Sequence, residues 1–192
     1  MDFIYCWILI ANLSTNNYMP PKMEERLHVC SNILSYVPEG RDPSIALAIG
    51  WQESGYTDAK GAWICTRKGK ITKTKQGTHR CISNPNSKHV SKLTRAVGPM
   101  QILPIYHCKK KKSCSTTSKK TLRGVNLLYK LIDQYGEKKG IAIYAGGYLN
   151  PKSLRYTKRA LKLAAQIREG HFPGKYSMPL PKEIMWLWRK IK

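Results

Sequence analysis

The chain has 192 residues, of which 42% are apolar and 23% are charged, and this globular composition excludes a disordered or fibrous protein. Lys and Arg total 34 against 11 Asp and Glu, a formal net charge of +23. Such an excess favours an anionic partner, for example nucleic acid, a membrane or lipopolysaccharide surface, or an acidic cell-wall polymer. No apolar run approaches the roughly 20 residues that span a bilayer, which argues against an integral membrane protein.

The first segment, from Phe3 to Leu13, is apolar and has the length of a secretory signal. Only Met1 and Asp2 precede it, without Lys or Arg, and no clear small-x-small cleavage site follows. Two interpretations stay open: a cleaved signal, or an uncleaved first helix that packs on a core or anchors near a membrane. Residues 1–40 are assigned to an N-terminal helical segment.

Helical spacing of apolar residues over 22–37 predicts the next helix, and Asp42 with Pro43 predicts the start of a buried helix that runs to Glu53. Residues 61–92 contain β-prone pieces at 62–66 and 70–74 and predict a small hairpin or a long loop. Further helices are predicted at 121–135, 138–145, 154–167 and 182–191. These elements predict an α+β, predominantly helical fold, with a main domain at 41–170 and a basic amphipathic tail helix within 171–192.

Six cysteines are present, and none belongs to a Cys-x-x-Cys pair, so a structural zinc site is not predicted. Cys65 and Cys81 bracket a stretch rich in Lys, Gly and Thr, and Cys108 and Cys114 bracket four lysines. Such polar loops cannot pack a core of their own, which favours disulfide staples, each worth about 3 kcal/mol, over free thiols. Staples predict an oxidising, extracytoplasmic compartment, whereas six free thiols would indicate the cytosol.

Glu53 follows the apolar turn at 47–51, so its carboxyl group is expected at the end of a buried helix. Removal from water and the negative end of the helix dipole both favour the protonated form of this group. A carboxylic acid that stays protonated near neutral pH can act as a general acid. The alternative is a glutamate that simply faces water at a helix end.

Glu53 also begins the first of four segments that occur in a characteristic order. It starts Glu-Ser-Gly-Tyr at 53–56, followed by Gly-Pro-Met-Gln-Ile-Leu-Pro at 98–104, Tyr-Ala-Gly-Gly-Tyr at 144–148, and Tyr156 in a predicted helix. This arrangement resembles the lytic transglycosylases with a goose-type lysozyme-like catalytic domain, which cleave peptidoglycan. The resemblance covers about residues 43–167 and implies a lysozyme-like fold with no metal and no cofactor.

The resemblance implies a role for each matching residue. Glu53 would be the only catalytic acid and base. The substrate-binding residues would be Ser54 near the scissile sugar, Met100 and Gln101 along the groove, Tyr144 behind the glutamate, Tyr156 on its carboxyl group, and Tyr56 and Gly146 beside them. Gln101 would also help to position Glu53 or the glycan. Polar amides and aromatic faces of this kind suit N-acetylated sugars.

A single carboxylate implies a lyase, because glycoside hydrolases typically use two. In the family, the glutamate protonates the oxygen between N-acetylmuramic acid and N-acetylglucosamine, and the muramoyl 6-hydroxyl closes a 1,6-anhydro ring. Asp58 is the best candidate for a second carboxylate, and it would make the protein an inverting goose-type lysozyme. Ala145 stands where the family usually has Asn, which leaves an inactive glycan-binding protein as another alternative.

Clustered positive charge suggests further partners. Basic residues gather in the loops at Arg67, Lys68, Lys70, Lys73, Lys75 and 109–112, either to attract anionic envelope polymers or as a solvated surface. The predicted helix at 182–191 has a cationic, Trp-containing amphipathic pattern, typical of a membrane-surface helix or of one that closes the domain. A nucleic-acid-binding protein is supported by charge alone. The family resemblance makes peptidoglycan the expected partner. The expected location of the protein is the periplasm or cell envelope, or a phage virion.

Overall fold

The computed structural model describes residues 2–14, 21–66, 70–74, 78–83, 85, 90–108 and 111–170. Most of these residues are helical and a few form short strands, which confirms the predicted α+β, predominantly helical class. The helices are α1 (Asp2–Leu13), α2 (Met23–Tyr36), α3 (Ser44–Ser54), α4 (Pro104–His107), α5 (Thr117–Tyr135), α6 (Glu137–Gly146) and α7 (Pro151–Glu169), with a 3-10 helix, η1 (Lys111–Cys114). The strands are β1 (Lys60–Cys65), β2 (Lys70–Lys73), β3 (His79–Ile82) and β4 (Leu93–Val97).

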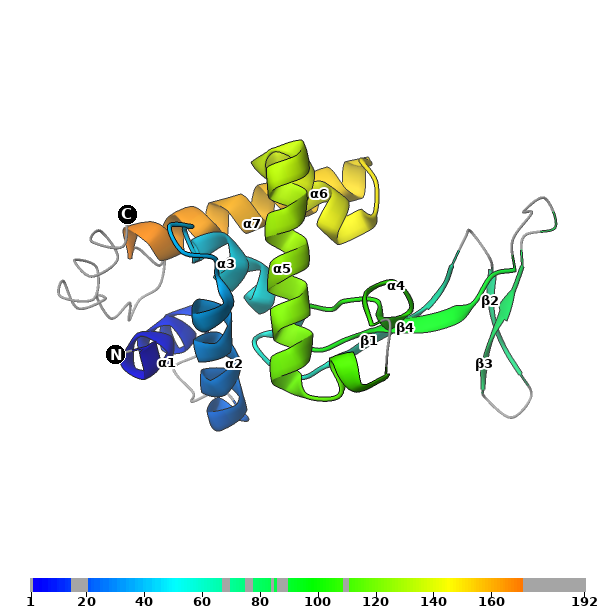
Figure 1. Ribbon diagram of the computed structural model, residues 1–192, viewed down its shortest axis with the longest axis horizontal. Helices are drawn as coiled ribbons and strands as arrows, with labels where there is room; N and C mark the ends of the chain where they lie inside the picture. Colours follow the sequence, from blue (N-terminus) through cyan, green and yellow to red (C-terminus); the bar gives the residue numbers. More distant parts are fainter. Residues whose placement is uncertain are drawn as a thin grey trace.

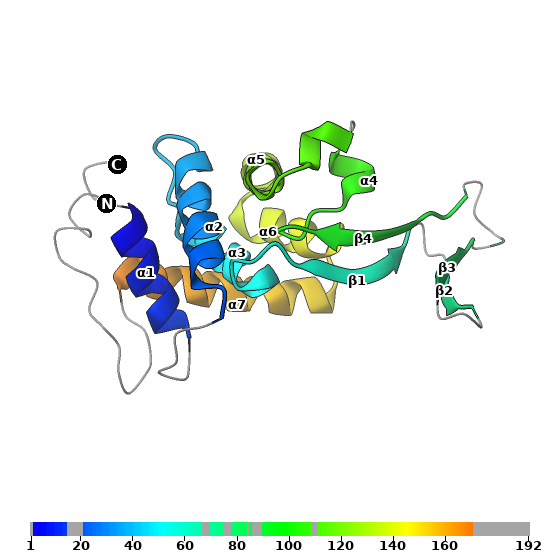
Figure 2. The ribbon, with the colours of Figure 1, turned by 90° about the horizontal axis from the view of Figure 1, so that it is seen from below.

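The helices gather into one body, and the strands extend from it as an arm (Figures 1 and 2). Helix α3 lies in the core of this body, and its residues Ser44 to Gly50 are all buried. Both α2 and α7 contact α3, while α5 packs against α2 and α6. The apolar sequence of α3 therefore has neighbours to cover it, and its last turn carries Glu53 out of the core.

Two helices begin earlier than their apolar periodicity predicts, because polar side chains cap them. Asn150 accepts hydrogen bonds from the backbone N–H groups of Lys152 and Ser153, and the Ser153 hydroxyl accepts one from the Asn150 N–H, so α7 starts at Pro151. Thr116 caps α5 in the same manner. Periodic apolar residues mark only the buried stretch of a helix, whereas the cap marks its end.

Helix α1 is part of the protein core. Its side chains Tyr5, Cys6, Leu9 and Ile10 are buried, and it packs against α2. A disulfide between Cys6 and Cys30 joins the two helices. One face of the apolar N-terminal segment is therefore covered by protein in this fold, whereas Phe3 and Ile4 are exposed.

The arm consists of two antiparallel ribbons, β1 with β4 and β2 with β3. Trp63 pairs with Arg95 across the first ribbon, and the Arg95 guanidinium lies 5.0 Å from the Trp63 ring centre. The Cys65–Cys81 disulfide connects β1 to β3. A small hairpin, β2 with β3, lies within the predicted stretch 61–92, but the two predicted pieces do not pair with each other, because β1 pairs with β4, a strand beyond residue 92.

The third disulfide joins Cys108, directly after α4, to Cys114, the last residue of η1. Together with the Cys65–Cys81 bond, it confirms both predicted disulfides. All six cysteines are thereby paired. Three disulfides are typical of a protein that folds in an oxidising, extracytoplasmic compartment.

Several sequence predictions lie outside the described residues. They concern the helix at 182–191 and the basic positions Arg67, Lys68, Lys75, Lys109 and Lys110. Within the described ranges, no helix combines the length and the apolar character needed to cross a bilayer.

Candidate active site

Glu53 meets Tyr156 where the last turn of α3 packs against the first half of α7. The Tyr156 hydroxyl donates a hydrogen bond to Glu53 Oε1 at 2.6 Å, across 103 residues of sequence. Figures 1 and 2 both place α3 alongside α7. The hydrogen bond expected from the family resemblance is therefore present in the fold.

Burial governs the electrostatics of this pair. It raises the pKa of Glu53 above the usual carboxyl value, and the hydrogen bond from Tyr156 opposes part of that rise. Burial and then the Glu53 charge raise the pKa values of Tyr156 and Tyr144. Both phenols thus stay neutral and act as donors, and the carboxyl group keeps its proton to a higher pH than an exposed glutamate would.

Tyr144 joins α6 to the turn that follows β4. Its hydroxyl donates to the Met100 carbonyl at 2.5 Å. Gly124 of α5 makes this packing possible, because a Cβ there would lie 2.2 Å from Met100 Cβ and 3.3 Å from the Tyr144 hydroxyl. Gly124 was not singled out by the sequence, where nothing distinguishes it from any other helical glycine.

The hydroxyl groups of Ser54 and Tyr56, both predicted to bind substrate, form hydrogen bonds within the protein. The Ser54 hydroxyl donates to the Pro99 carbonyl at 2.9 Å and accepts from the Thr57 N–H, so it ties the end of α3 to the turn after β4. Tyr56 is fully buried and donates to the Leu47 carbonyl at 2.9 Å. Their polar groups are used by the protein backbone, which makes both residues supports of the site.

Met100 and Gln101, also predicted to line the groove, make contacts within the protein as well. Met100 is fully buried and belongs to the core instead of an open groove wall. The Gln101 amide donates to the carbonyls of Ala59 at 3.0 Å and Gly98 at 2.8 Å, and so holds the start of the arm against the 98–102 turn. Gln101 has φ +47° and Tyr56 has φ +62°, a region that L-residues seldom adopt, and such strain often accompanies functional sites.

Gly146 lies where the end of α6 approaches the start of α7. A Cβ at this position would come within 3.1 Å of Ser153 Cβ and 3.2 Å of Asn150 Nδ2. These contacts are tighter than most Cβ contacts in proteins, so the close approach of the two helices favours a glycine at this position. Ala145 beside it is exposed.

Two residues of α2 support the segment after Glu53, and the sequence did not indicate them. Arg26 donates to the Gly55 carbonyl and lies over the Trp51 ring at 5.7 Å. Glu25 Oε1 accepts from the Asp58 backbone N–H at 2.6 Å. The only signal available was a charged first turn in a helix, which is common on surfaces.

Asp58 is held in an ion pair with α5. Lys120 Nζ lies 2.9 Å from Asp58 Oδ1 and 2.7 Å from Oδ2, and the Thr117 hydroxyl donates to Oδ2 at 2.8 Å. Both carboxylate oxygens are therefore occupied by protein donors. Among the residues described, no group of three or more His, Cys, Asp or Glu side chains is placed to hold a metal ion.

Comparison with known proteins adds no relative: no family model, no curated protein and no solved structure matches the chain. A functional hypothesis therefore depends on the four short motifs and on the geometry of the residues around Glu53.

Proposed function

We propose that the protein is a lysozyme-like lytic transglycosylase, which cleaves the β-1,4 bond between N-acetylmuramic acid and N-acetylglucosamine in peptidoglycan. The observation that carries the proposal is the hydrogen bond of 2.6 Å from Tyr156 to a partly buried Glu53 whose pKa is raised by burial. A protonated carboxylic acid next to a neutral donor suits protonation of a glycosidic oxygen.

The hydrogen bond also assigns the two carboxyl oxygens. Because Tyr156 donates to Glu53 Oε1, the other oxygen, Oε2, is the one that would carry the acidic proton to the substrate. Glu53 gives this proton to the bridging oxygen as the bond to the muramoyl anomeric carbon breaks. The carboxylate then takes the proton of the muramoyl 6-hydroxyl group. At the same time, the oxygen of that hydroxyl group bonds to the anomeric carbon. The step consumes no water, forms a 1,6-anhydro sugar and returns Glu53 to its acid form.

The occupancy of Asp58 favours this lyase over an inverting hydrolase. A hydrolase needs a second carboxylate that is free to hold a water molecule. Both oxygens of Asp58 accept hydrogen bonds from Lys120, and one also accepts from Thr117. The carboxylate is thus used to join the segment after α3 to the first turn of α5.

Asp58→Asn is expected to lower stability by about 1–2 kcal/mol, because Lys120 loses its charged partner, and to leave the products unchanged. Thermal unfolding followed by circular dichroism measures the first effect, and mass spectrometry of released muropeptides measures the second. Lys120→Met is the matched control, with a similar loss of stability. A different outcome would establish a hydrolase: the wild-type protein would release muropeptides with reducing ends, the Asp58→Asn variant would not, and the Lys120→Met variant still would.

Tyr156→Phe is expected to lower kcat about tenfold while leaving KM for cell walls nearly unchanged, because the variant loses the donor that orients Glu53. Since that hydrogen bond lowers the pKa of Glu53, its loss also moves the alkaline limb of the pH–rate profile upward. Tyr135→Phe, on the exposed end of α5, serves as control. An unchanged kcat and an unmoved alkaline limb in Tyr156→Phe would remove Tyr156 from the site.

Zymography on purified cell walls tests the activity itself. A clearing zone whose products carry anhydro ends is the expected result. Salt-sensitive DNA binding without clearing would support the nucleic-acid alternative, and wall binding without clearing would indicate an inactive glycan-binding protein. The net charge of +23 supports attraction of the protein to acidic envelope polymers.

A further inference from the structure

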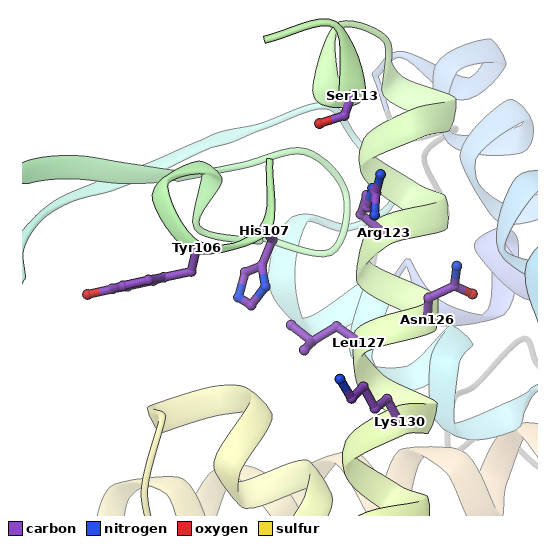
Figure 3. A pocket seen from close by; sticks show the side chains of 7 residues that line it. All are labelled: Tyr106, His107, Ser113, Arg123, Asn126, Leu127 and Lys130. Atoms are coloured by element: carbon purple, nitrogen blue, oxygen red, sulfur yellow. The ribbon is translucent and has the colours of Figure 1, made fainter. Parts of the chain in front are cut away.

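A cavity of 490 Å³ lies between α4, η1 and α5, apart from the residues around Glu53 (Figure 3). Its volume is in the range of about 300–1,000 Å³ that small-ligand sites occupy. The lining residues are Tyr106, His107, Ser113, Arg123, Asn126, Leu127 and Lys130. None of the residues predicted for the active site lines it.

One wall of the cavity is the outer face of α5. Arg123, Leu127 and Lys130 follow each other at helical spacing and so share one side of the helix, while Gly124 and Leu128 are buried in the core. Across from this wall, His107 faces Leu127 (Figure 3). The Cys108–Cys114 disulfide fixes the opposite wall, because its cysteines directly follow His107 and Ser113 in the chain.

The cavity carries positive charge without an acid to balance it. Arg123 and Lys130 are the charged residues in its lining, and no Asp or Glu is among the seven. Neither cation takes part in a salt bridge between the described residues. Burial lowers the pKa of His107, so this ring is neutral at pH 7 and adds a hydrogen-bonding group without a third charge. Arg123 and Lys130 lie seven residues apart on this face of α5, about 10 Å along the helix axis. A cavity with two cations and no counter-charge in its lining favours an anionic ligand.

We propose that this cavity binds a sugar that carries an oxyanion, either a carboxylate or a phosphate. The Arg123 guanidinium would hold the oxyanion through paired N–H groups, and Lys130 would add a second positive charge to the same cavity. Tyr106, which is 53% exposed, and Leu127 offer an aromatic and an apolar surface to a sugar ring. The Asn126 amide can bond a hydroxyl or acetamido group. The proposal stands whether or not Glu53 is catalytic.

Calorimetric titration of the oxidised full chain at about 150 mM salt tests the proposal, a salt level that screens long-range attraction. The probes are N-acetylglucosamine 6-phosphate, glucuronic acid, neutral N-acetylglucosamine and inorganic phosphate. At least one of the two anionic sugars is expected to bind at least about tenfold more tightly than both the neutral sugar and inorganic phosphate. Tighter binding of N-acetylglucosamine 6-phosphate would identify the oxyanion as a phosphate, and tighter binding of glucuronic acid would identify it as a carboxylate. On saturation, the His107 ring resonance, assigned by its loss in His107→Gln, is expected to shift.

Matched variants separate this site from the general positive charge of the chain. Arg123→Gln/Lys130→Gln is expected to weaken the anionic sugar at least about tenfold, whereas Lys158→Gln/Lys162→Gln, which removes two exposed charges from α7, leaves the affinity within twofold. Tyr106→Ala is expected to weaken the sugar anion and not inorganic phosphate. Equal losses in both double variants, equal affinity for the neutral sugar, or no saturable binding of either anionic sugar would overturn the proposal. Circular dichroism confirms that each variant is folded.

Discussion

Glu53→Gln is expected to lower cell-wall lysis by about 10³-fold or more, because it removes the only acid and base that the proposed reaction uses. The amide keeps an oxygen that can accept the hydrogen bond from Tyr156, so the geometry around the site is preserved. Release of anhydro-muropeptides from purified walls measures the loss. Glu39→Gln, at an exposed position in the loop before α3, provides a control with the same chemical change from a carboxyl group to an amide.

The same substitution is expected to stabilise the fold near neutral pH. Burial raises the pKa of Glu53 in the folded state. The wild-type carboxyl group therefore contributes most to the stability of the fold at low pH, and this contribution is lost as the pH rises through the folded-state pKa. Gln carries no charge to desolvate, and a gain of about 1 kcal/mol would raise Tm by about 2–4 °C at pH 7. The gain is expected to shrink at pH 4.

Two results would contradict this account of Glu53. Substantial lysis by Glu53→Gln would exclude it as the acid, and a Tm lower than wild type at pH 7 would exclude a desolvated carboxyl group. An inactive but stabilised variant is the combination expected of a residue that is retained for chemistry at a cost in stability.

Cys6→Ala/Cys30→Ala is expected to destabilise the protein by about 3 kcal/mol, since the disulfide closes a sequence separation of 24 between α1 and α2. Loss of the Cys108–Cys114 bond, with a separation of 6, is expected to cost about 2 kcal/mol by the same chain-entropy argument. Denaturant unfolding followed by circular dichroism compares the two variants with the wild type.

The order of the two losses tests the placement of α1 in the core. An N-terminal helix that contributed nothing to the fold would make the Cys6–Cys30 variant as stable as the wild type. Thiol titration of the unreduced, denatured chain provides an independent check, and no reactive thiol is expected because all six cysteines are paired.

Local sequence patterns predicted the elements that need no distant partner. The apolar run into Glu53 predicted a buried helix, and the structure forms α3 there. The pairs Cys65–Cys81 and Cys108–Cys114 could be expected from the polar loops between them. Strand β4 and helix α4 were missed, because a strand is defined by the partner it pairs with and a four-residue helix carries no periodicity.

The sequence by itself determined the excess of positive charge, the helical periodicity, the two cysteine pairs that close polar loops and the presence of one glutamate at the end of an apolar helix. Tertiary structure alone decided that Glu53 meets Tyr156 and that Ser54 and Gln101 bond to backbone carbonyls. The physical reason is distance along the chain. Periodicity repeats within a few residues and can be recognised locally, whereas a contact across 103 residues exists only once α3 and α7 have packed together.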